Sequence, residues 1–528
     1  MKKTFFALCA FMLTGMIMAQ DTPQDTPQDT PQEGSTVIEI STVAELLAIT
    51  DLNANYILTD NITLTDDNGD PINWVPIGDP TGKDDTQLEN YSFNGTFDGN
   101  EKSIKGLTFT ISDPDAIYMG LFGRIGSKGV VKNLNVESSN GIYASAGRTD
   151  DGSRNIGTIA GVNHGKILNC SSNVDVYCHA NLLDGGGIAG ENQGLIKNCA
   201  YSGTIHRNDP SSNPYSSFHI GGIVGDNESN GTLQNCFTQA TIQNTPGHEL
   251  YGQNAENGHI LDCAYYYRDT NFGGVKLEGR TFYRVDRNWN TLCLPFDVTI
   301  QGSVFSDAIV MELDTDSEGS SYAHPTGIVE GEDEAGEPIN TLYLNFKAAD
   351  RIIAGKPYLV RWNNPDETNE LVDPSFPGAN LADMLLWGET PKGVTSADGN
   401  VTFMGTYFSK DIEETGGDNT VLFLKADADG GFTNTLYYPD APMSINSLRA
   451  YFQLNNGYVG GWYMPGGGSS INVFNLNFGE GSTGLKKVEL NIPSDSDEVY
   501  DLSGRHVDNE NLRPGIYIKN GKKYLIRK

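Results

Sequence analysis

The sequence has few basic residues and few cysteines, and after its first 19 residues it has no long apolar run. Of its 528 residues, 35 are Lys or Arg and 68 are Asp or Glu, which gives a formal net charge of −33. So acidic a chain repels nucleic-acid phosphates and anionic lipid headgroups, so neither is an expected partner. No later run reaches about 18 apolar residues, and we expect no membrane-spanning segment in the mature chain.

Recognisable catalytic and metal-binding motifs are also missing. The 8 histidines form no His-Glu-x-x-His motif. The sequence has no Gly-x-Ser-x-Gly elbow, no phosphate-binding loop and no Cys-x-x-Cys pair. Motifs therefore predict no particular enzymatic reaction.

The N-terminal segment has the features of an export signal. Lys2 and Lys3 precede a mostly apolar run over residues 5–19 that ends in a small residue. We interpret residues 1–19 as a signal peptide, and the Asp-Thr-Pro-Gln repeats within residues 20–35 as an extended linker.

A repeated unit, Gly-x-(Val/Ile/Leu)-x-(Asn/Asp)-(Cys/Leu), is the strongest pattern in the sequence. It recurs at intervals of roughly 30 residues, a Gly-x-x-Gly element precedes most copies, and neither element has a helical period. Short strands at this interval cannot each bury an apolar face alone, whereas stacked coils can. The pattern predicts an all-β chain in which residues 36–272 form a right-handed parallel β-helix with an N-terminal cap. The copies of the unit begin at Gly129, Gly165, Gly194, Gly231 and Gly258.

These two elements resemble the GLUG motif of secreted and surface proteins of bacteria. The likeness lies in the element Gly221-Gly222-Ile223-Val224-Gly225 and the Asn-Cys pair that follows it, and it covers roughly residues 95–265. The resemblance implies a β-helix at a cell surface, with adhesion in many members and no single chemistry.

Four cysteines take the last position of the unit, where other copies have leucine. A position that accepts leucine is apolar, so we predict a stack of buried free thiols, with a disulfide or a metal site as alternatives. The Asn or Asp before each cysteine is predicted to form a ladder between coils, with a ligand role as the alternative. The state of Cys178 and Cys293 stays open. The predicted structural ladder consists of Asn169, Cys170, Asn198, Cys199, Asn235, Cys236, Asp262 and Cys263.

Three longer connections are expected to lie along one edge of the stacked coils. They cover residues 145–155, 206–217 and, more briefly, 177–184, at equivalent positions of the repeat. Loops on a rigid scaffold commonly carry binding sites, so this edge is the candidate ligand face, and harmless surface insertion is the alternative. The candidate binding residues, suited to sugars or carboxylates, are Arg148, Arg154, His206, Arg207 and Tyr215.

No metal or other cofactor is predicted, and calcium is the open alternative. Residues 314–319 and 427–430 are acidic clusters, but the first lacks the final glutamate of an EF-hand loop. Solvated acidic turns are therefore the expectation for both.

The rest of the chain has strand-like segments without the repeat. Alternating aromatic and β-branched residues predict an antiparallel β-sandwich region over residues 273–480, as one or two domains. Residues 485–528 form a small C-terminal β domain that resembles the sorting domain of type IX secretion; a small terminal sheet is the alternative. The residues that carry this resemblance include Asp501, Gly504, Arg505, Gly515 and Tyr517.

Together these features predict an exported protein, secreted or at the surface of a Gram-negative bacterium. The expected function is non-catalytic: an adhesin or a module that binds a host or dietary glycan or a surface protein. The secretion machinery is the expected partner of the tail. The alternatives are a β-helix polysaccharide lyase or glycoside hydrolase, and a purely structural stalk.

Overall fold

The computed structural model describes residues 36–81, 83–108, 117–138, 141–144, 154–178, 183–207, 218–243, 250–268, 273–284, 289–316, 322, 324–332, 338–362, 370–379, 390–412, 419–426, 432–439, 442–460, 469–478, 487–489, 499–501, 506–507, 515–519 and 522–526. Over these residues the chain is nearly all β, with extensive parallel sheets. No helix of this described part is long and apolar enough to cross a membrane.

The described chain begins with a short α-helix, a 3-10 helix and four strands. The side chain of Thr42 accepts a hydrogen bond from the Glu45 backbone N–H, and the Glu45 carboxylate accepts one from Thr42. These two hydrogen bonds form a capping box at the start of the helix α1. Leu46 of α1 is buried in the core of the repeats that follow. The elements are β1 (Val37–Ile40), α1 (Val43–Leu47), β2 (Asn55–Leu58), β3 (Ile62–Thr63), the 3-10 helix η1 (Asp85–Tyr91) and β4 (Thr96–Lys105).

Five ladders of parallel strands make up the repeat region, and each joins equivalent strands of successive repeats. The first ladder contains β5 (Tyr118–Met119), β9 (Arg154–Ile156), β14 (Leu183–Gly186) and β19 (Phe218–Gly221). The second contains β6 (Phe122–Ile125), β10 (Ala160–Asn163), β15 (Ala189–Asn192), β20 (Val224–Asn227) and β24 (Tyr251–Asn254). The third contains β7 (Val130–Glu137), β11 (Lys166–Leu168), β16 (Leu195–Lys197), β21 (Thr232–Gln234) and β25 (His259–Leu261). The fourth runs from the end of β7 through β12 (Ser171–Ser172), β17 (Ala200–Tyr201), β22 (Phe237–Thr238) and β26 (Cys263–Arg268). The fifth contains β8 (Ile142–Ala144), β13 (Val176–Cys178), β18 (Thr204–Arg207) and β23 (Thr241–Gln243).

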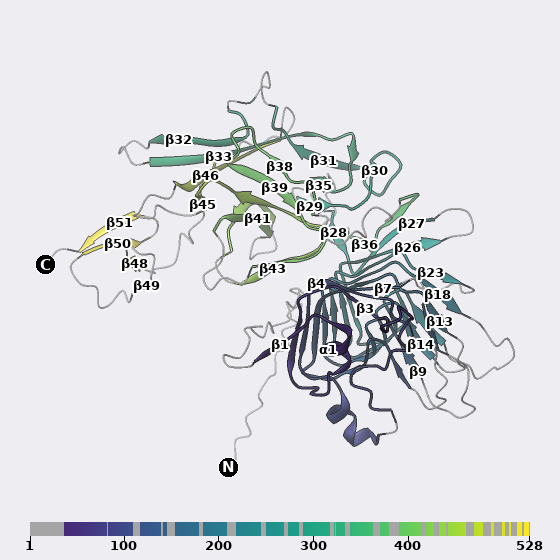
Figure 1. Ribbon diagram of the computed structural model, residues 1–528. Helices are drawn as coiled ribbons and strands as arrows, with labels where there is room; N and C mark the ends of the chain where they lie inside the picture. The colour runs from purple at the N-terminus through teal and green to yellow at the C-terminus, as the bar shows by residue number, and fades with distance from the viewer. Residues whose placement is uncertain are drawn as a thin grey trace, which may run out of the picture.

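Figure 1 shows these strands stacked side by side in the lower part of the molecule, with β23, β18, β13, β14 and β9 along one side. Their inward residues form one continuous apolar core, because equivalent positions of each repeat carry similar side chains. Val131, Ile167, Ile196 and Leu233 are register partners in the third ladder, and all are 0% exposed.

Among the described residues, the C-terminal half of the molecule, from residue 273 to 489, contains two larger sheets and three strand pairs. The eight-stranded sheet contains β29 (Asn290–Cys293), β35 (Pro357–Trp362), β31 (Ala308–Leu313), β33 (Pro338–Ala348), β46 (Ser469–Asn477) and β45 (Tyr458–Gly460), with β32 (Gly327–Glu332) and β47 (Lys487–Glu489) beside it. The five-stranded sheet contains β38 (Val394–Thr395), β39 (Val401–Gly405), β44 (Ala450–Leu454), β41 (Val421–Ala426) and β42 (Phe432–Tyr437). The pairs are β28 (Thr281–Tyr283) with β36 (Glu370–Val372), β30 (Val298–Thr299) with β34 (Arg351–Ile352), and β40 (Lys410–Ile412) with β43 (Met443–Ile445).

The two larger sheets share an apolar core. Phe346 of β33 lies 6.1 Å from Phe403 and 6.3 Å from Phe452, both of the five-stranded sheet, between ring centroids. The sequence led us to expect antiparallel pairing throughout this region. The structure differs, because β46 is parallel to both β33 and β45. Between β33 and β46 the chain passes through the whole five-stranded sheet, and so long a connection allows it to return in the same direction.

The sheet of the repeats continues into the C-terminal half. The last strand of the fourth ladder, β26, pairs with β27 (Gly273–Glu278), which pairs with β37 (Ser375–Pro377). A separate four-stranded antiparallel sheet ends the chain, at the left of Figure 1. It contains β48 (Val499–Asp501), β49 (His506–Val507), β50 (Gly515–Lys519) and β51 (Lys522–Ile526). Both boundaries predicted after residues 272 and 480 are thus crossed by strand pairing, since β47 also joins β46.

Candidate functional site

The expected ligand edge lies between the fifth and first ladders, where the three longer connections leave the strands. Residues 145–153, 179–182 and 208–217 of these connections lie outside the described residues, and with them Arg148 and Tyr215. Arg207 ends β18, but its side chain is not among those described. The described side chains at this edge are therefore those of the flanking strands, in the fifth and first ladders.

His206, a predicted binding residue, belongs to a polar row on the fifth ladder. Its ring stacks on that of Tyr177, with centroids 4.0 Å apart and an interplanar angle of 1°. Its Nδ1 is 3.1 Å from the Gln243 side-chain oxygen, and its Nε2 is 3.9 Å from an oxygen of Asp175. Tyr177, His206 and Gln243 are register partners in β13, β18 and β23, which is why their side chains lie one above another.

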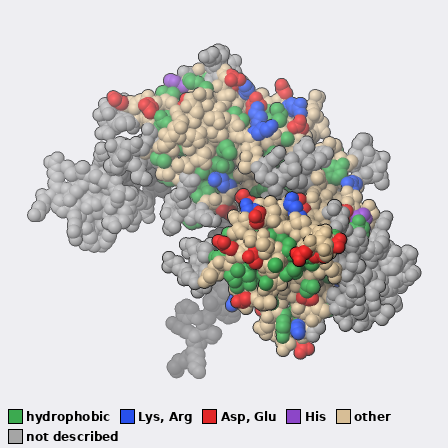
Figure 2. Space-filling view, viewed as in Figure 1, with side chains coloured by type: hydrophobic (Ala, Val, Ile, Leu, Met, Phe, Trp, Pro, Cys, Tyr) green, Lys and Arg blue, Asp and Glu red, His purple; other side chains and the backbone are tan. Residues whose placement is uncertain are grey.

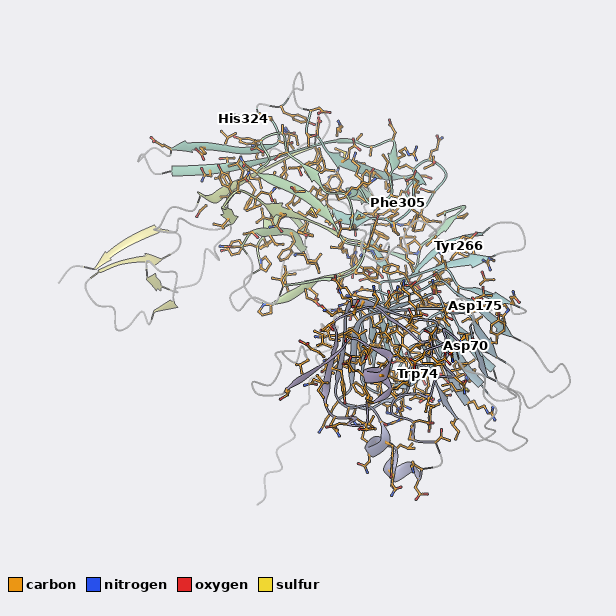
Figure 3. All side chains as sticks on the ribbon, in the orientation of Figure 1. Asp70, Trp74, Asp175, Tyr266, Phe305 and His324 are labelled. Carbon is orange, nitrogen blue, oxygen red and sulfur yellow. The ribbon has the colours of Figure 1, made fainter. Side chains whose placement is uncertain are left out.

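The row presents polar atoms at its rim. The ring faces of His206 and Tyr177 cover each other, while the His206 side chain stays 22% exposed and that of Asp175 38%. In Figure 3 Asp175 lies toward the same side of the repeats as β13 and β18. The Nε2 atom of His206 is itself buried, and its Nδ1 atom faces Gln243. A ligand at this edge would therefore meet ring edges, the Gln243 amide and the Asp175 carboxylate.

Arg154 does not fit the role that the sequence suggested for it. It begins β9, as the register partner of Leu183, and is only 2% exposed. The prediction treated this residue as part of an exposed connection, whereas pairing in the first ladder draws it into the wall of the repeats. His206 is thus the described binding candidate that keeps an accessible side chain.

A second polar group, Asp184, His219 and Asp226, lies on the other side of the same connections. Asp184 of β14 and His219 of β19 are register partners in the first ladder. The Nδ1 atom of His219 is 2.9 Å from Asp184 Oδ1 and 3.2 Å from Asp226 Oδ2. These three residues form the cluster referred to below as the Asp-His-Asp group.

Glycine at position 225 makes this meeting of two ladders feasible. Asp226 belongs to β20 of the second ladder, one residue after Gly225. A Cβ atom at position 225 would lie 2.4 Å from the Gly185 nitrogen and 2.6 Å from the His219 carbonyl oxygen, closer than real contacts allow. The absence of a side chain therefore lets the two ladders approach until Asp226 reaches His219.

Burial and hydrogen bonding shift the pKa values of this group. Hydrogen bonds to Asp184 and then to Asp226 raise the pKa of His219 to about 10. Burial raises the pKa of Asp184, against the opposing effect of its bond with His219. Burial also raises the pKa of the neighbouring Glu191, whose carboxylate accepts a hydrogen bond from Asn155 Nδ2 at 3.0 Å. At neutral pH the raised pKa of His219 favours a charged imidazolium.

Of the two acidic clusters weighed for calcium, the structure describes only residues 314–316. Asp314 accepts hydrogen bonds from Lys347 Nζ at 3.1 Å and from the Asp316 backbone, and it is 8% exposed, so this residue is not solvated as we expected. Residues 317–321 and 427–431 lie outside the described residues. Among the residues that the structure describes, the Asp-His-Asp group is the one set that brings three metal-ligating atoms together.

The four cysteines of the repeat point into the core. Cys170, Cys199, Cys236 and Cys263 are free and 0% exposed, and the side chains of Cys178 and Cys293 are 0% exposed as well. The Sγ atoms of the four repeat cysteines lie 3.3–3.7 Å from carbonyl oxygens of the preceding repeat. Burial raises the pKa of the Cys263 thiol, as expected for a thiol packed as an apolar side chain.

The residue before each cysteine forms a row of hydrogen-bonded amides. Nδ2 of Asn169 donates to Asn133, that of Asn198 to Asn169, and that of Asn235 to Asn198, at 3.0–3.2 Å. Each has a left-handed backbone, with φ between 53° and 56°. Asparagine adopts this conformation more readily than most residues, so it can form both the corner and the row.

Asp262 ends this asparagine row. A carboxylate cannot donate to the Asn235 side-chain oxygen, which is buried without a hydrogen-bond partner. The Asp262 Oδ1 atom instead lies 3.5 Å from Arg280 and 3.6 Å from Arg449, both in the C-terminal half. Burial raises the pKa of Asp262, and Arg449 opposes the shift. The row thus passes from amide pairing to ionic contact where the repeats end.

A second asparagine row, which the sequence analysis missed, lies along the second ladder. Its members are the last residues of the strands β10, β15, β20 and β24. Nδ2 of Asn163 donates to Asn192, that of Asn192 to Asn227, and that of Asn227 to Asn254, at 2.6–2.8 Å. The donors in this row point toward the following repeat, opposite to the first row. The signal was present in the sequence, since each of these asparagines stands two positions after a glycine, namely Gly161, Gly190, Gly225 and Gly252.

Comparisons with protein-family models, with curated proteins and with solved structures gave no match for this chain. Its function must be argued from its own residues. The two groups that flank the longer connections, the polar row of His206 and the Asp-His-Asp group, are the candidates for that function.

Proposed function

We propose that residues 36–272 form a right-handed parallel β-helix of GLUG-like repeats and that residues 273–480 form a β-sandwich region. Parallel pairing between equivalent strands in five ladders supports the first assignment. The apolar core shared by the eight- and five-stranded sheets supports the second. Such a scaffold holds side chains of one register position in a straight line.

On this scaffold, we propose a non-catalytic binding protein that is exported to the surface of a Gram-negative bacterium. The address rests on the signal-like residues 1–19 and on the resemblance of the tail to a sorting domain. The four-stranded sheet of residues 499–528 is compatible with a small independent tail. Figure 2 shows acidic side chains over both halves of the molecule, which makes anionic polymers poor ligands.

The observation that carries the binding proposal is the row of Tyr177, His206 and Gln243 beside Asp175. Neutral glycans are recognised by amide and carboxylate groups that exchange hydrogen bonds with sugar hydroxyls, next to aromatic rings. The row offers these groups at the spacing of neighbouring strands, about 4.8 Å. A neutral extended glycan is therefore the ligand class that the edge fits.

The enzyme alternative draws on the Asp-His-Asp group, because a carboxyl group whose pKa burial raises, as it does for Asp184, suits acid catalysis. A glycoside hydrolase or lyase would release reducing ends from the glycan that it binds. Incubating the purified chain with each bound polysaccharide, and measuring reducing ends, separates the two functions. Turnover that Asp226→Asn abolishes would replace the binding proposal by the enzyme.

The test of binding is a glycan array probed with the purified chain and its variants. We expect binding to a neutral glycan, and at least tenfold weaker binding by His206→Ala and by Tyr177→Ala. The matched controls are His259→Ala and Tyr91→Ala, which remove exposed rings from other parts of the repeats and should bind normally. The same labelled glycan should decorate intact cells that produce the full chain, but not cells whose chain lacks residues 499–528. Equal binding by all four variants would refute this ligand face.

A further inference from the structure

The Asp-His-Asp group has the donor atoms and the spacing of a metal site. One imidazole nitrogen and two carboxylate oxygens, from Asp184, His219 and Asp226, all lie within 4.8 Å of one another. Ligands at about 2.1 Å from a metal ion stand roughly 3.0–3.4 Å apart in octahedral or tetrahedral sites. The two distances from His219 Nδ1, 2.9 and 3.2 Å, are close to that spacing.

Hydrogen bonding alone leaves this group incompletely satisfied. The Nδ1 atom of His219 carries at most one proton, yet it faces two carboxylate oxygens. Asp226 is 6% exposed, and its other oxygen, Oδ1, is buried with no hydrogen-bond partner. The Oδ1 atom of Asn155, which is 4% exposed, is in the same condition beside the group. A buried carboxylate oxygen without a donor is costly. A metal ion that takes the place of the proton on His219 Nδ1 would contact both carboxylates at once, which a single proton cannot do.

We propose that Asp184, His219 and Asp226 bind a divalent transition-metal ion of the zinc class. A nitrogen ligand beside two carboxylates suits Zn²⁺, Mn²⁺ or Co²⁺, whereas Ca²⁺ takes oxygen ligands only. The ion joins two neighbouring strands of the first ladder to one of the second, at the base of connections 179–182 and 208–217. It is a second site, separate from the proposed glycan face on the fifth ladder.

The repeat pattern places this site at one level of the stack. In the first ladder, the register partners at this position are Tyr118, Asn155, Asp184 and His219. Two metal-ligating side chains are therefore neighbours only in the last two strands of this ladder, β14 and β19. In the second ladder Asp226 is followed by Gln253. We therefore expect one ion per chain.

The experiment is calorimetric titration of the full mature chain, produced without a histidine tag and treated with a chelator, using ZnCl₂, MnCl₂ and CaCl₂. The expected result is one Zn²⁺ per chain, with at least tenfold weaker binding by Asp226→Asn and by His219→Gln. The control His259→Gln, an exposed histidine of β25, should bind as the unmodified chain does. No saturable zinc binding, unchanged affinity in both variants, or a preference for Ca²⁺ would overturn the proposal.

A second measurement needs no variant and so does not depend on how the variants fold. X-ray absorption of the zinc-loaded unmodified chain should show one imidazole among oxygen ligands. A sulfur shell would assign the metal to the cysteines instead, and a purely oxygen shell to an acidic cluster. Either result would overturn the assignment to the Asp-His-Asp group.

Discussion

At the scale of single residues, buried polar side chains of the repeats depend on partners from neighbouring repeats. Arg124 is 6% exposed; one of its guanidinium nitrogens bonds Glu89 and Ser92, and the other lies 3.0 Å from His164 Nδ1. Because the guanidinium can only donate, this nitrogen of His164 must accept and the ring is neutral. Burial, and then the charge of Arg124, lowers the pKa of His164 to about 4.

This residue should make the protein sensitive to mild acid. In the unfolded chain His164 takes up a proton below about pH 6.5, whereas in the folded chain it does so only near pH 4. Between these values the unfolded state binds more protons, so the free energy of unfolding falls as the pH falls. We expect the loss of unfolding free energy between pH 7 and 4.5 to be smaller by about 2–3 kcal/mol in His164→Gln, which keeps an acceptor. Urea denaturation at the two pH values measures it. The exposed His259→Gln should lose as much as the unmodified chain, and an equal loss in His164→Gln would contradict the explanation.

Residue positions that recur could be predicted, and those that occur once could not. The inward cysteines follow from Leu134 at the equivalent position, because a stack repeats its core. Asp184, His219 and Asp226 share no motif, lie in two ladders and meet at one level only. No periodicity reveals such a group; what brings it together is the close approach at Gly225.

At the scale of elements, the asparagine rows hold successive corners in register. Asn198 donates to Asn169 and accepts from Asn235, and its oxygen also accepts from Ser409 in the C-terminal half. Its φ of 56° adds a conformational requirement to this hydrogen bonding. Each corner therefore depends on the corners before and after it.

Asn198→Ala should destabilise the protein beyond the strain of its backbone conformation. The change leaves buried amide atoms of two neighbouring asparagines without partners, which we expect to cost about 2–4 kcal/mol together with the strain. Asn230, with a φ of 81° in an exposed turn, provides the control, because Asn230→Ala carries only the strain of about 1 kcal/mol. Urea unfolding of the two variants gives the difference. Equal destabilisation would mean that the row contributes nothing beyond its dihedral angles.

The elements that the sequence revealed are those whose partners lie one repeat away. The strands around each Asn-Cys pair belong to this class, and their spacing predicts their pairing. The parallel pair of β33 and β46 does not belong to this class. Asn340 and Ser470, which form a hydrogen bond across this pair, are 130 residues apart, and no sequence pattern links them. Local alternation predicts that these segments are strands but says nothing of their order in a sheet.

At the scale of the whole molecule, the C-terminal half covers the last repeat. Phe237 and Ala264, on the outer face of the fourth ladder, are buried in a core with Leu292 and Tyr358 of the C-terminal half. The ring of Phe237 meets that of Phe408 edge to face at 5.1 Å. The Lys197 side chain pairs with Asp411 at 3.1 Å, and β27 supplies the strand that β26 would otherwise lack. This half therefore protects the apolar outer face and the strand edge where the repeats end.

Removing that cover should make the repeats self-associate. A chain that ends at residue 268 would expose the β26 edge and the side chain of Phe237, and an open edge beside an apolar patch pairs with other chains. A chain that ends at residue 489 keeps β27, Phe408 and β47, and loses only the segment that contains the small terminal sheet. Light scattering coupled to size-exclusion chromatography should find larger assemblies for the shorter chain than for the longer one. If both truncated chains form particles with the same number of chains as the full protein does, the C-terminal half is an appended domain rather than the cap of the repeats.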